Sequence, residues 1–472
     1  MRKTWIIILP LIFLFSCKKN HVQQTPPPPP PPADGLPVTV TLNQSQPGYA
    51  ISQSFEGLSF ETKILTANPD FLNVNNTVLV QMIKNLGPGI LRIGGGTSDE
   101  VYWSDNPRGP NTSADSLTST DIDRLAAFST ATGWPVLFGL NLGSYDVAAT
   151  SNEAFYVRNS LGINLYAFQS GNEPDVFYYG MRPPTYNFAN FQPEWEAYFS
   201  AVKNAVPDAS FAGPDVAYNT DWITAFAGAE HNNVKLLDAH YYLTGPATSP
   251  YINYQTLLAY NPKLQGVLNI IKEQSVKYNL PYRISESNNV YGGGKPGTSD
   301  VFASALWALD VMWTIAGNNG SGINFHSGDG LFYSPVSIQN GVMQANPEYY
   351  AMLAFKYAGT GGTTIPVTVS NSEYCGAYAC LRADNTCVLT LINKDERNNY
   401  SFTILLNRNT PGIQIQRLTA PAVTSATGIS FAGSTVNADG TFAEKTTEQY
   451  TINNNSILVQ VPAGSAAIVT VL

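Results

Sequence analysis

The chain has 472 residues, of which 12% are charged, and its formal net charge is −9. A chain of this length exceeds what one compact core usually holds, so we expect more than one domain. Lysine and arginine form no run longer than two residues, which argues against a groove for nucleic acid or for a long sulfated polymer.

The N-terminus has the pattern of an export segment. Arg2 and Lys3 precede the apolar run WIIILPLIFLF, and Ser16-Cys17 follows it, so residues 1–17 are predicted to be a lipoprotein signal peptide with a lipobox and Cys17 as the lipidated residue. The alternative is an ordinary cleaved signal peptide in which Cys17 is incidental. The first interpretation predicts an exported lipoprotein of the bacterial outer membrane, facing the periplasm or the cell surface and attached through its lipid anchor only.

Two short segments precede the main body of the chain. Residues 18–37 are predicted to be an extended linker, because seven consecutive prolines end at Pro32 and favour a stiff polyproline II conformation. The segment 38–53 begins with VTVTLNQ, an alternating strand pattern. We expect this strand to pair with the C-terminal region rather than with the sheet that follows it directly.

Eight apolar runs alternate with helix-period segments between residues 54 and 360. The intervening segments, such as TVLVQMIKNL and TDIDRLAAFSTA, repeat apolar residues at three- and four-residue spacing. This alternation predicts an α/β fold, specifically a (β/α)8 TIM barrel. The predicted strands are 54–61, 87–95, 134–142, 165–173, 209–216, 234–242, 281–288 and 321–328.

The region 361–472 has a different pattern. Short alternating runs such as CVLTLIN and SILVQV, broken by Asn, Gly and Pro, predict a C-terminal antiparallel β-sandwich domain. Its cysteines Cys375, Cys380 and Cys387 allow one disulfide in three possible pairings, and we expect a structural role for them. The chain has neither zinc-type spacing nor a dinucleotide fingerprint, so we predict no metal site and no cofactor.

Two glutamates carry the predicted chemistry. Glu173 ends the fourth predicted strand and Glu286 lies towards the end of the seventh. Catalytic groups of such barrels lie at the C-terminal ends of the strands, and a pair of carboxylates there is the usual apparatus for cleaving a glycosidic bond. We predict a retaining enzyme, with carboxyl groups about 5–5.5 Å apart. The alternative is that both are surface or helix-capping carboxylates.

Five segments resemble one known family in their order along the chain. They are LRIGGGTSD (91–99), PVLFGLNL (135–142), GNEP (171–174), AHYYL (239–243) and ESNNVYGGG (286–294). They are similar to the landmarks of glycoside hydrolase family 79, the β-glucuronidase and heparanase family of clan A, from about residue 38 to the end. The resemblance implies that Glu173 is the acid/base and Glu286 the nucleophile.

Further residues are expected near the two carboxylates. Asn172 can donate to a sugar 2-hydroxyl, and Arg92 can keep the nucleophile ionised; the alternative for Arg92 is a salt bridge that only closes the barrel. Tyr241 is expected to donate to the nucleophile, because the resemblance aligns it there. A shift of one residue would give this role to Tyr242, since neighbouring strand residues face opposite sides.

The resemblance also implies how a uronic acid is bound. Its carboxylate would meet the hydroxyl groups of Tyr291 and Tyr333 and backbone amides, including those of the GDGLF loop that contains Gly330. Lys295 is an alternative cationic partner, and GGG (292–294) could instead be only a turn.

Acidic and imidazole groups at other strand ends complete the predicted site. Glu61 and Asp105 are candidates for the more distant sugar hydroxyls, with loop or helix caps as the alternative. His326 is expected to orient other groups rather than to react.

The favoured function is a retaining, exo-acting β-glucuronidase whose partner is a glycan or glycoside containing uronic acid. The alternatives are another clan A glycosidase, such as a β-glucosidase, β-xylosidase or arabinofuranosidase, and a glycan-binding surface lipoprotein without activity. No oligomeric state is predicted.

Overall fold

The computed structural model describes residues 35–43, 45–46, 48–260, 262–370 and 373–472. The predicted signal peptide with Cys17 and nearly all of the predicted linker lie outside these residues. Within the described part of the chain, no helix is both long enough and apolar enough to span a bilayer.

Eight parallel strands form a barrel, which confirms the predicted fold and all eight predicted strands. The strands follow the order β7-β6-β3-β2-β11-β10-β9-β8, and Phe168, at the start of the ring, bridges to Phe211, just before β8, at its other end. The backbone N–H of Phe168 donates to the carbonyl of Ser210 at 2.9 Å, so the ring is closed. The bounds are β2 (Glu56–Glu61), β3 (Ile90–Gly94), β6 (Val136–Leu140), β7 (Leu165–Ser170), β8 (Ala212–Val216), β9 (Leu236–Thr244), β10 (Tyr282–Val290) and β11 (Ile323–Ser327).

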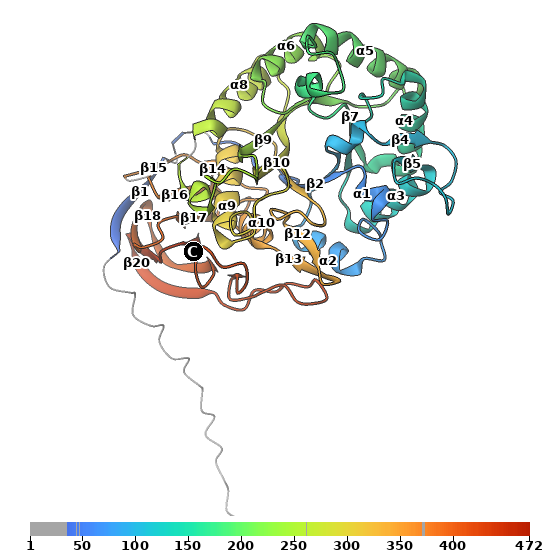
Figure 1. The fold of residues 1–472 in the computed structure, drawn as a ribbon. Helices are drawn as coiled ribbons and strands as arrows, with labels where there is room; N and C mark the ends of the chain where they lie inside the picture. Colours follow the sequence, from blue (N-terminus) through green and yellow to red (C-terminus); the bar gives the residue numbers. More distant parts are fainter. Residues whose placement is uncertain (1–34, 44, 47, 261, 371–372) are drawn as a thin grey trace, which may run out of the picture. The chain divides into compact units, whose positions relative to one another are not determined.

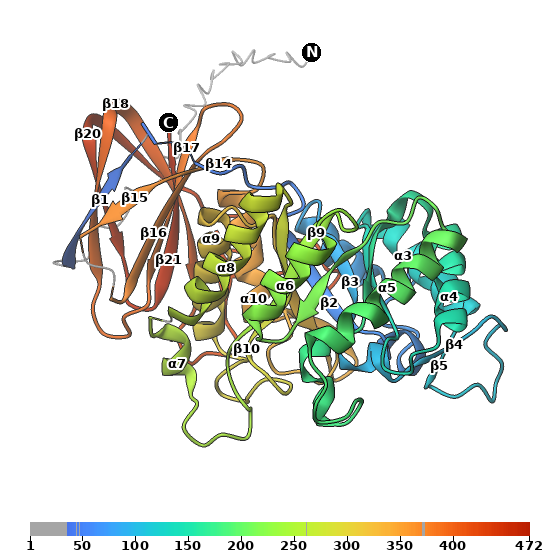
Figure 2. The same ribbon diagram turned by 90° about the horizontal axis from the view of Figure 1, so that it is seen from above.

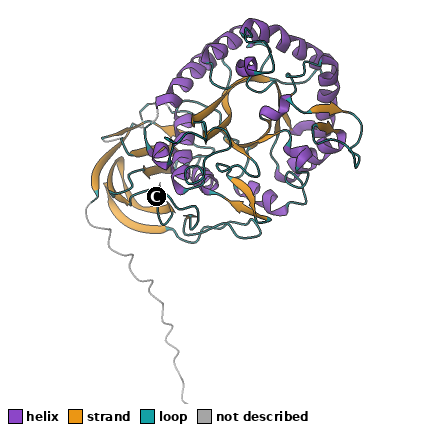
Figure 3. Ribbon diagram, viewed as in Figure 1, coloured by secondary structure: helices purple, strands orange, loops and turns teal. Residues whose placement is uncertain are grey.

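Helices surround this ring of strands, as Figures 1 and 3 show. Several helices begin at an Asn or Asp whose side chain accepts a backbone N–H, for example Asn76 and Asp146, which satisfies a donor that the helix itself leaves unpaired. The longer helices are α2 (Thr77–Asn85), α3 (Ser119–Thr132), α4 (Val147–Leu161), α5 (Phe188–Ala205), α6 (Thr220–Glu230), α8 (Pro262–Tyr278), α9 (Phe302–Gly317) and α10 (Pro347–Ala358). Short helices are α1 (Ile64–Ala67), α7 (Tyr254–Leu258), η1 (Gly96–Asp99), η2 (Gly162–Asn164) and η3 (Pro174–Tyr179).

Two small ribbons lie in the loops of the barrel. They pair β4 (Tyr102–Ser104) with β5 (Ser116–Thr118), and β12 (Val336–Gln339) with β13 (Val342–Ala345).

The C-terminal region is a β-domain built mainly from antiparallel pairs, as predicted. Its strands are β14 (Thr363–Ile365), β15 (Val367–Val369), β16 (Cys375–Leu381), β17 (Cys387–Asn393), β18 (Tyr400–Thr419), β19 (Ser430–Phe431), β20 (Glu448–Val461) and β21 (Ser465–Val471). One buried cluster draws side chains from β16, β17, β18, β20 and β21. The sheet therefore encloses a core of its own.

The strand β1 (Leu36–Leu42), formed by the VTVTLNQ segment, belongs to this C-terminal sheet. It runs parallel to β18 and antiparallel to β15. Its alternate residues Val38, Val40 and Leu42 are buried in the core of the sheet.

The sheet packs on α9 and α10 of the barrel, which Figure 2 shows from a second direction. Asp310 of α9 accepts from Lys394 Nζ at 2.9 Å and from the hydroxyl of Tyr378 at 2.5 Å. The ring of Tyr378 stacks on Trp313, with centroids 5.7 Å apart. Cys375, Cys380 and Cys387 are all buried, and the structure has no S–S bond among them. The disulfide that the sequence allowed therefore does not form.

Candidate active site

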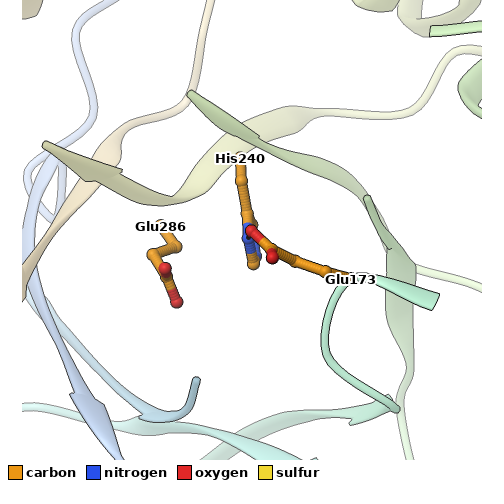
Figure 4. Close-up of side chains that lie close together, drawn as sticks. All are labelled: Glu173, His240 and Glu286. Carbon is orange, nitrogen blue, oxygen red and sulfur yellow. Dashed lines mark hydrogen bonds and ion pairs between the residues drawn. The ribbon is translucent and has the colours of Figure 1, made fainter. Parts of the chain in front are cut away.

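The two glutamates face each other inside the barrel (Figure 4). Glu173 follows β7 by three residues and adopts a left-handed conformation, with φ 53°, immediately before Pro174 begins η3. Glu286 lies within β10, which continues to Val290 beyond the end of the predicted strand. A carboxylate oxygen of each glutamate and a ring nitrogen of His240 lie within 4.8 Å of one another.

Glu286 is surrounded by groups that favour its charged form. Arg92 Nη1 donates to its Oε2 at 2.7 Å, and the Tyr242 hydroxyl donates to its Oε1 at 2.9 Å. The ring of His326 lies 3.4 Å from Oε2. Burial alone would raise the pKa of Glu286, but His326, His240 and Arg92 outweigh it and hold the pKa well below its usual value.

Glu173 has the opposite shift. Burial raises the pKa of its carboxyl, although His240 Nδ1, 2.9 Å from Oε1, acts in the other direction. One carboxyl is therefore held ionised while its neighbour keeps its proton more readily. Such a separation of pKa values is the pattern that distinguishes a nucleophile from a general acid.

A buried network behind His240 was missed in the sequence. The Nε2 atom of His240 lies 2.8 Å from Asp215 Oδ1, and Arg92 Nη2 donates to Asp215 Oδ2 at 2.7 Å. Gln169 donates to both Asp215 and Asp238. Burial would lower the pKa of His240, but Asp215 and Glu286 raise it well above its usual value.

Two signals could have found these residues. Asp215 ends the fifth predicted strand, and His240 shares a strand face with Tyr242. Both nitrogens of His240 are bound to carboxylates, those of Glu173 and Asp215. We therefore interpret Glu173, His240 and Asp215 as a proton-sharing chain, and His240 as a group that offers no free nitrogen to a metal.

The prediction that Tyr241 donates to Glu286 is wrong. Tyr242 has this position instead, as the alternative shift of one residue predicted. Tyr241 is buried on the outer side of β9 among the helices, where Lys263 Nζ lies 5.9 Å from the centre of its ring. Tyr242 faces the barrel interior and contacts Glu286. The two residues alternate as neighbours in a strand must.

A cavity of about 710 Å³ opens above the two carboxylates. Glu61 stands in its wall, where its Oε2 accepts from the backbone N–H of Thr97 at 2.8 Å and its Oε1 lies 3.4 Å from His326 Nε2. Tyr333 is 4% exposed, whereas Tyr291 is 46% exposed at the rim. The predicted residues that line the cavity are Glu61, Asn172, Glu173, Glu286, Tyr291, His326 and Tyr333.

Three predicted residues lie elsewhere. Asp105 is exposed on the loop after β4, and Gly330 is exposed beside the cavity while its neighbour Leu331 lines it. Lys295 donates to the carbonyl of Ser249 at 2.5 Å instead of entering the cavity. These positions were inferred on irregular loops, whose course depends on tertiary contacts rather than on strand periodicity.

Comparisons with known proteins agree with this geometry. The model of the glycosyl hydrolase family 79 C-terminal beta domain matches residues 377–468. A β-glucuronidase of Neurospora crassa is 24% identical over 428 residues, which cover 76% of this chain and 75% of the relative. A β-glucuronidase of Aspergillus niger is 24% identical over 482 residues, covering 85% and 88%.

One solved structure has a similar fold over nearly the whole length of this chain. A 4-O-α-L-rhamnosyl-β-D-glucuronidase from Fusarium oxysporum superposes with a TM-score of 0.76 at 19% sequence identity, covering 93% of this chain and all of that one. A closed (β/α)8 barrel, two facing carboxylates at its mouth and the matching C-terminal domain occur together here. The chain is a glycoside hydrolase, and it resembles glycoside hydrolase family 79 in its C-terminal domain and in its β-glucuronidase relatives.

Proposed function

We propose that this enzyme removes terminal β-linked glucuronic acid from glycans or glycoconjugates with retention of configuration. The observation that carries the proposal is the pair Glu173 and Glu286, with carboxylate oxygens within 4.8 Å and opposite pKa shifts. The approach of one oxygen of each carboxylate to within 4.8 Å favours a retaining pair, whose carboxyl groups stand about 5–5.5 Å apart, over an inverting pair, whose carboxyl groups stand roughly 6.5–9.5 Å apart to leave room for water. The names of the two fungal relatives supply the sugar.

In the first step, a Glu286 oxygen attacks the anomeric carbon and forms an ester bond to it. The bond from that carbon to the leaving-group oxygen breaks, and Glu173 gives its proton to this oxygen. Arg92 and Tyr242 hold Glu286 in position for attack.

In the second step, water attacks the same carbon and its proton passes to Glu173. The ester bond breaks, so Glu286 is released as a carboxylate and the sugar keeps its original configuration. His240, with its raised pKa, lies between Glu173 and Asp215 and favours the ionised form of Glu173 that this step requires.

The uronate carboxylate is proposed to lie between the loop after β10 and the loop after β11. Tyr291, Gly292, Gly293 and Tyr333 line this part of the cavity, and the two tyrosines would donate their hydroxyl groups. Lys263 also lines the cavity, where its Nζ donates to the backbone carbonyl of Tyr242 at 2.8 Å. A single lysine among the described lining residues supports exo-cleavage of one uronate over the binding of a sulfated chain.

The decisive assay compares nitrophenyl β-glucuronide with nitrophenyl β-glucoside, β-xyloside and α-arabinofuranoside. We expect the glucuronide to have the highest kcat/KM. Preference for a neutral sugar would mean that the enzyme has the substrate specificity of another clan A family. Inactivity on all four glycosides would favour glycan binding without catalysis.

Two variants identify the groups that select the uronate. Tyr333→Phe and Tyr291→Phe should each remove a donor to a charged group, at a cost of roughly 1.5–3 kcal/mol. That corresponds to about a ten- to hundredfold loss in kcat/KM on the glucuronide. Any trace activity on the glucoside should hold, because a neutral CH2OH group does not need these donors; an equal loss on both substrates would mean that the tyrosines only shape the cavity.

We also propose that the enzyme is an exported lipoprotein anchored through Cys17 to the bacterial outer membrane. The sequence RK-WIIILPLIFLF-SC supports this proposal. Labelled fatty acid should be incorporated into the parent chain and not into Cys17→Ser, which should also leave the membrane fraction. A parent chain that carries no fatty acid would overturn the proposal.

A further inference from the structure

The cavity extends past the proposed uronate site on the side of Glu173. There it is lined by Val176 and Tyr179, which follow β7, and by Ala217 and Tyr218, which follow β8. Because Glu173 is proposed to protonate the leaving-group oxygen, the leaving group must lie beside this carboxyl. The wall formed by these two loops is therefore what a leaving group meets.

Two exposed aromatic rings stand in this wall. Tyr179 is 77% exposed and Tyr218 is 56% exposed, although both belong to the cavity lining. A third ring, that of Tyr178, joins them: its centroid lies 4.2 Å from that of Tyr179, and its hydroxyl lies 2.8 Å from the hydroxyl of Tyr218. We call Tyr179 and Tyr218 the tyrosine platform.

The platform is fixed to the loop that carries Glu173. Asp175, two residues after Glu173, is buried and accepts the backbone N–H groups of Ala217, Tyr218 and Asn219 at 2.8, 3.2 and 3.0 Å. Hydrogen bonds from several donors to one buried carboxylate hold two loops in one arrangement. The backbone that carries the two rings is thus held in place before substrate arrives, which lowers the cost of ordering the loops on binding.

We propose that the tyrosine platform is the leaving-group subsite and that it binds a flat ring attached to the uronate. The ring is either the apolar face of a second sugar or a planar aromatic group, because both pack against an aromatic side chain. The cavity volume of about 710 Å³ supports a ligand larger than a single sugar, since pockets of about 300–1,000 Å³ hold drug-sized molecules. This inference rests on the proposed function.

The test measures kcat/KM on three substrates that share the uronate and differ in the leaving group. They are β-glucuronyl fluoride, nitrophenyl β-glucuronide and a disaccharide with glucuronic acid β-linked to a pyranose. For Tyr179→Ala and Tyr218→Ala, we expect the ratio of kcat/KM on a ring-bearing substrate to kcat/KM on the fluoride to fall about two- to tenfold. The double variant should show a larger fall.

Matched variants separate ring contact from damage to the fold. Tyr218→Phe keeps the ring and should retain most of the parent ratio, and Tyr102→Ala removes a tyrosine of similar exposure, 58%, from β4 outside the cavity. A fall on both ring-bearing substrates, or on one of them, supports the subsite and identifies the ring it takes. An unchanged ratio in the double variant would overturn the subsite proposal alone, whereas a parent enzyme that does not hydrolyse the fluoride would overturn the proposed function.

Discussion

At the scale of single residues, the difference between the two glutamates comes from their neighbours. Glu173 and Glu286 are the same side chain, and both are largely removed from water. Cationic and hydroxyl groups converge on Glu286, whereas burial dominates at Glu173. The proposed roles of acid and nucleophile therefore depend on the surrounding side chains.

Replacing each glutamate should give different kinetic results. Glu286→Gln should lower turnover at least about a thousandfold on every substrate, because no covalent intermediate can form. Glu173→Ala should lose most activity on poor leaving groups but keep much of it on dinitrophenyl glucuronide, whose leaving group needs no proton. Azide should restore part of the Glu173→Ala rate and give β-glucuronyl azide. An equal loss in both variants without azide rescue would contradict the assigned roles.

The corrected tyrosine assignment gives a second prediction. Tyr242→Phe removes the hydroxyl that donates to Glu286 at 2.9 Å, so kcat/KM should fall by about ten- to a hundredfold. Tyr241→Phe, one residue earlier, is the matched control and should retain nearly full activity. A larger loss in Tyr241→Phe than in Tyr242→Phe would mean that Tyr241 donates to Glu286, as first predicted.

The pH dependence of kcat/KM follows from the same pKa shifts. Glu286 must be ionised, so activity should be lost only when the pH falls through its lowered pKa, well below the usual 4.5. Glu173 must be protonated, so activity should be lost as the pH rises through its raised pKa, above 4.5. The free enzyme should thus show a bell-shaped profile.

Among the charged groups that lower the pKa of Glu286, His326 has the largest effect. His326→Asn should therefore move the acid limb of the profile to higher pH and leave the alkaline limb nearly in place. An acid limb that stays fixed would show that His326 has no part in keeping Glu286 ionised.

At the scale of elements, strands were easier to predict than loops. The eight barrel strands are buried apolar runs, and this pattern specifies their existence and order with ends that differ by a few residues. The positions of Glu173 and Glu286 follow from those strands. The pattern could not choose between Tyr241 and Tyr242, because AHYYL places an aromatic ring on both strand faces and the periodicity fits either phase.

Loop positions depend on contacts that a local pattern does not contain. Asp105 and Gly330 were expected in the site but lie on exposed loop segments. Lys263 lines the cavity from the start of α8, a helix rather than a strand end. Asp215 and His240 become neighbours only when β8 and β9 pair in the closed barrel.

The loop after β10 offers a prediction at this scale. Gly294 has φ +80°, and a Cβ there would lie 2.7 Å from the backbone nitrogen of Tyr333. Gly294→Ala should displace Tyr333 and lower kcat/KM on the glucuronide. Gly297→Ala is the control, because Gly297 also has a positive φ, +71°, but a Cβ there meets open space. Equal losses in both variants would mean that backbone strain, rather than the contact with Tyr333, is responsible.

At the scale of the whole molecule, the barrel and the C-terminal sheet share buried surface. Val388, Ile392 and Ile468 of the sheet belong to the same apolar cluster as the helices α9 and α10. Asp310 adds polar contacts with Lys394 and Tyr378 across the same junction. Elements that share a core in this way are expected to unfold together.

The strand β1 allows this cooperativity to be tested far from the active site. Val40 is fully buried in the core of the sheet, and Val40→Ala removes the equivalent of two methylene groups at about 0.8 kcal/mol each, plus a cavity cost. The midpoint of thermal unfolding should fall by a few degrees, and the fall should be the same whether circular dichroism or residual glycosidase activity is followed. Thr39→Ala, on the exposed face of the same strand, should change neither curve. If activity survives at temperatures where Val40→Ala has already lost its strand signal, then the barrel is stable without the sheet and the shared core does not couple them.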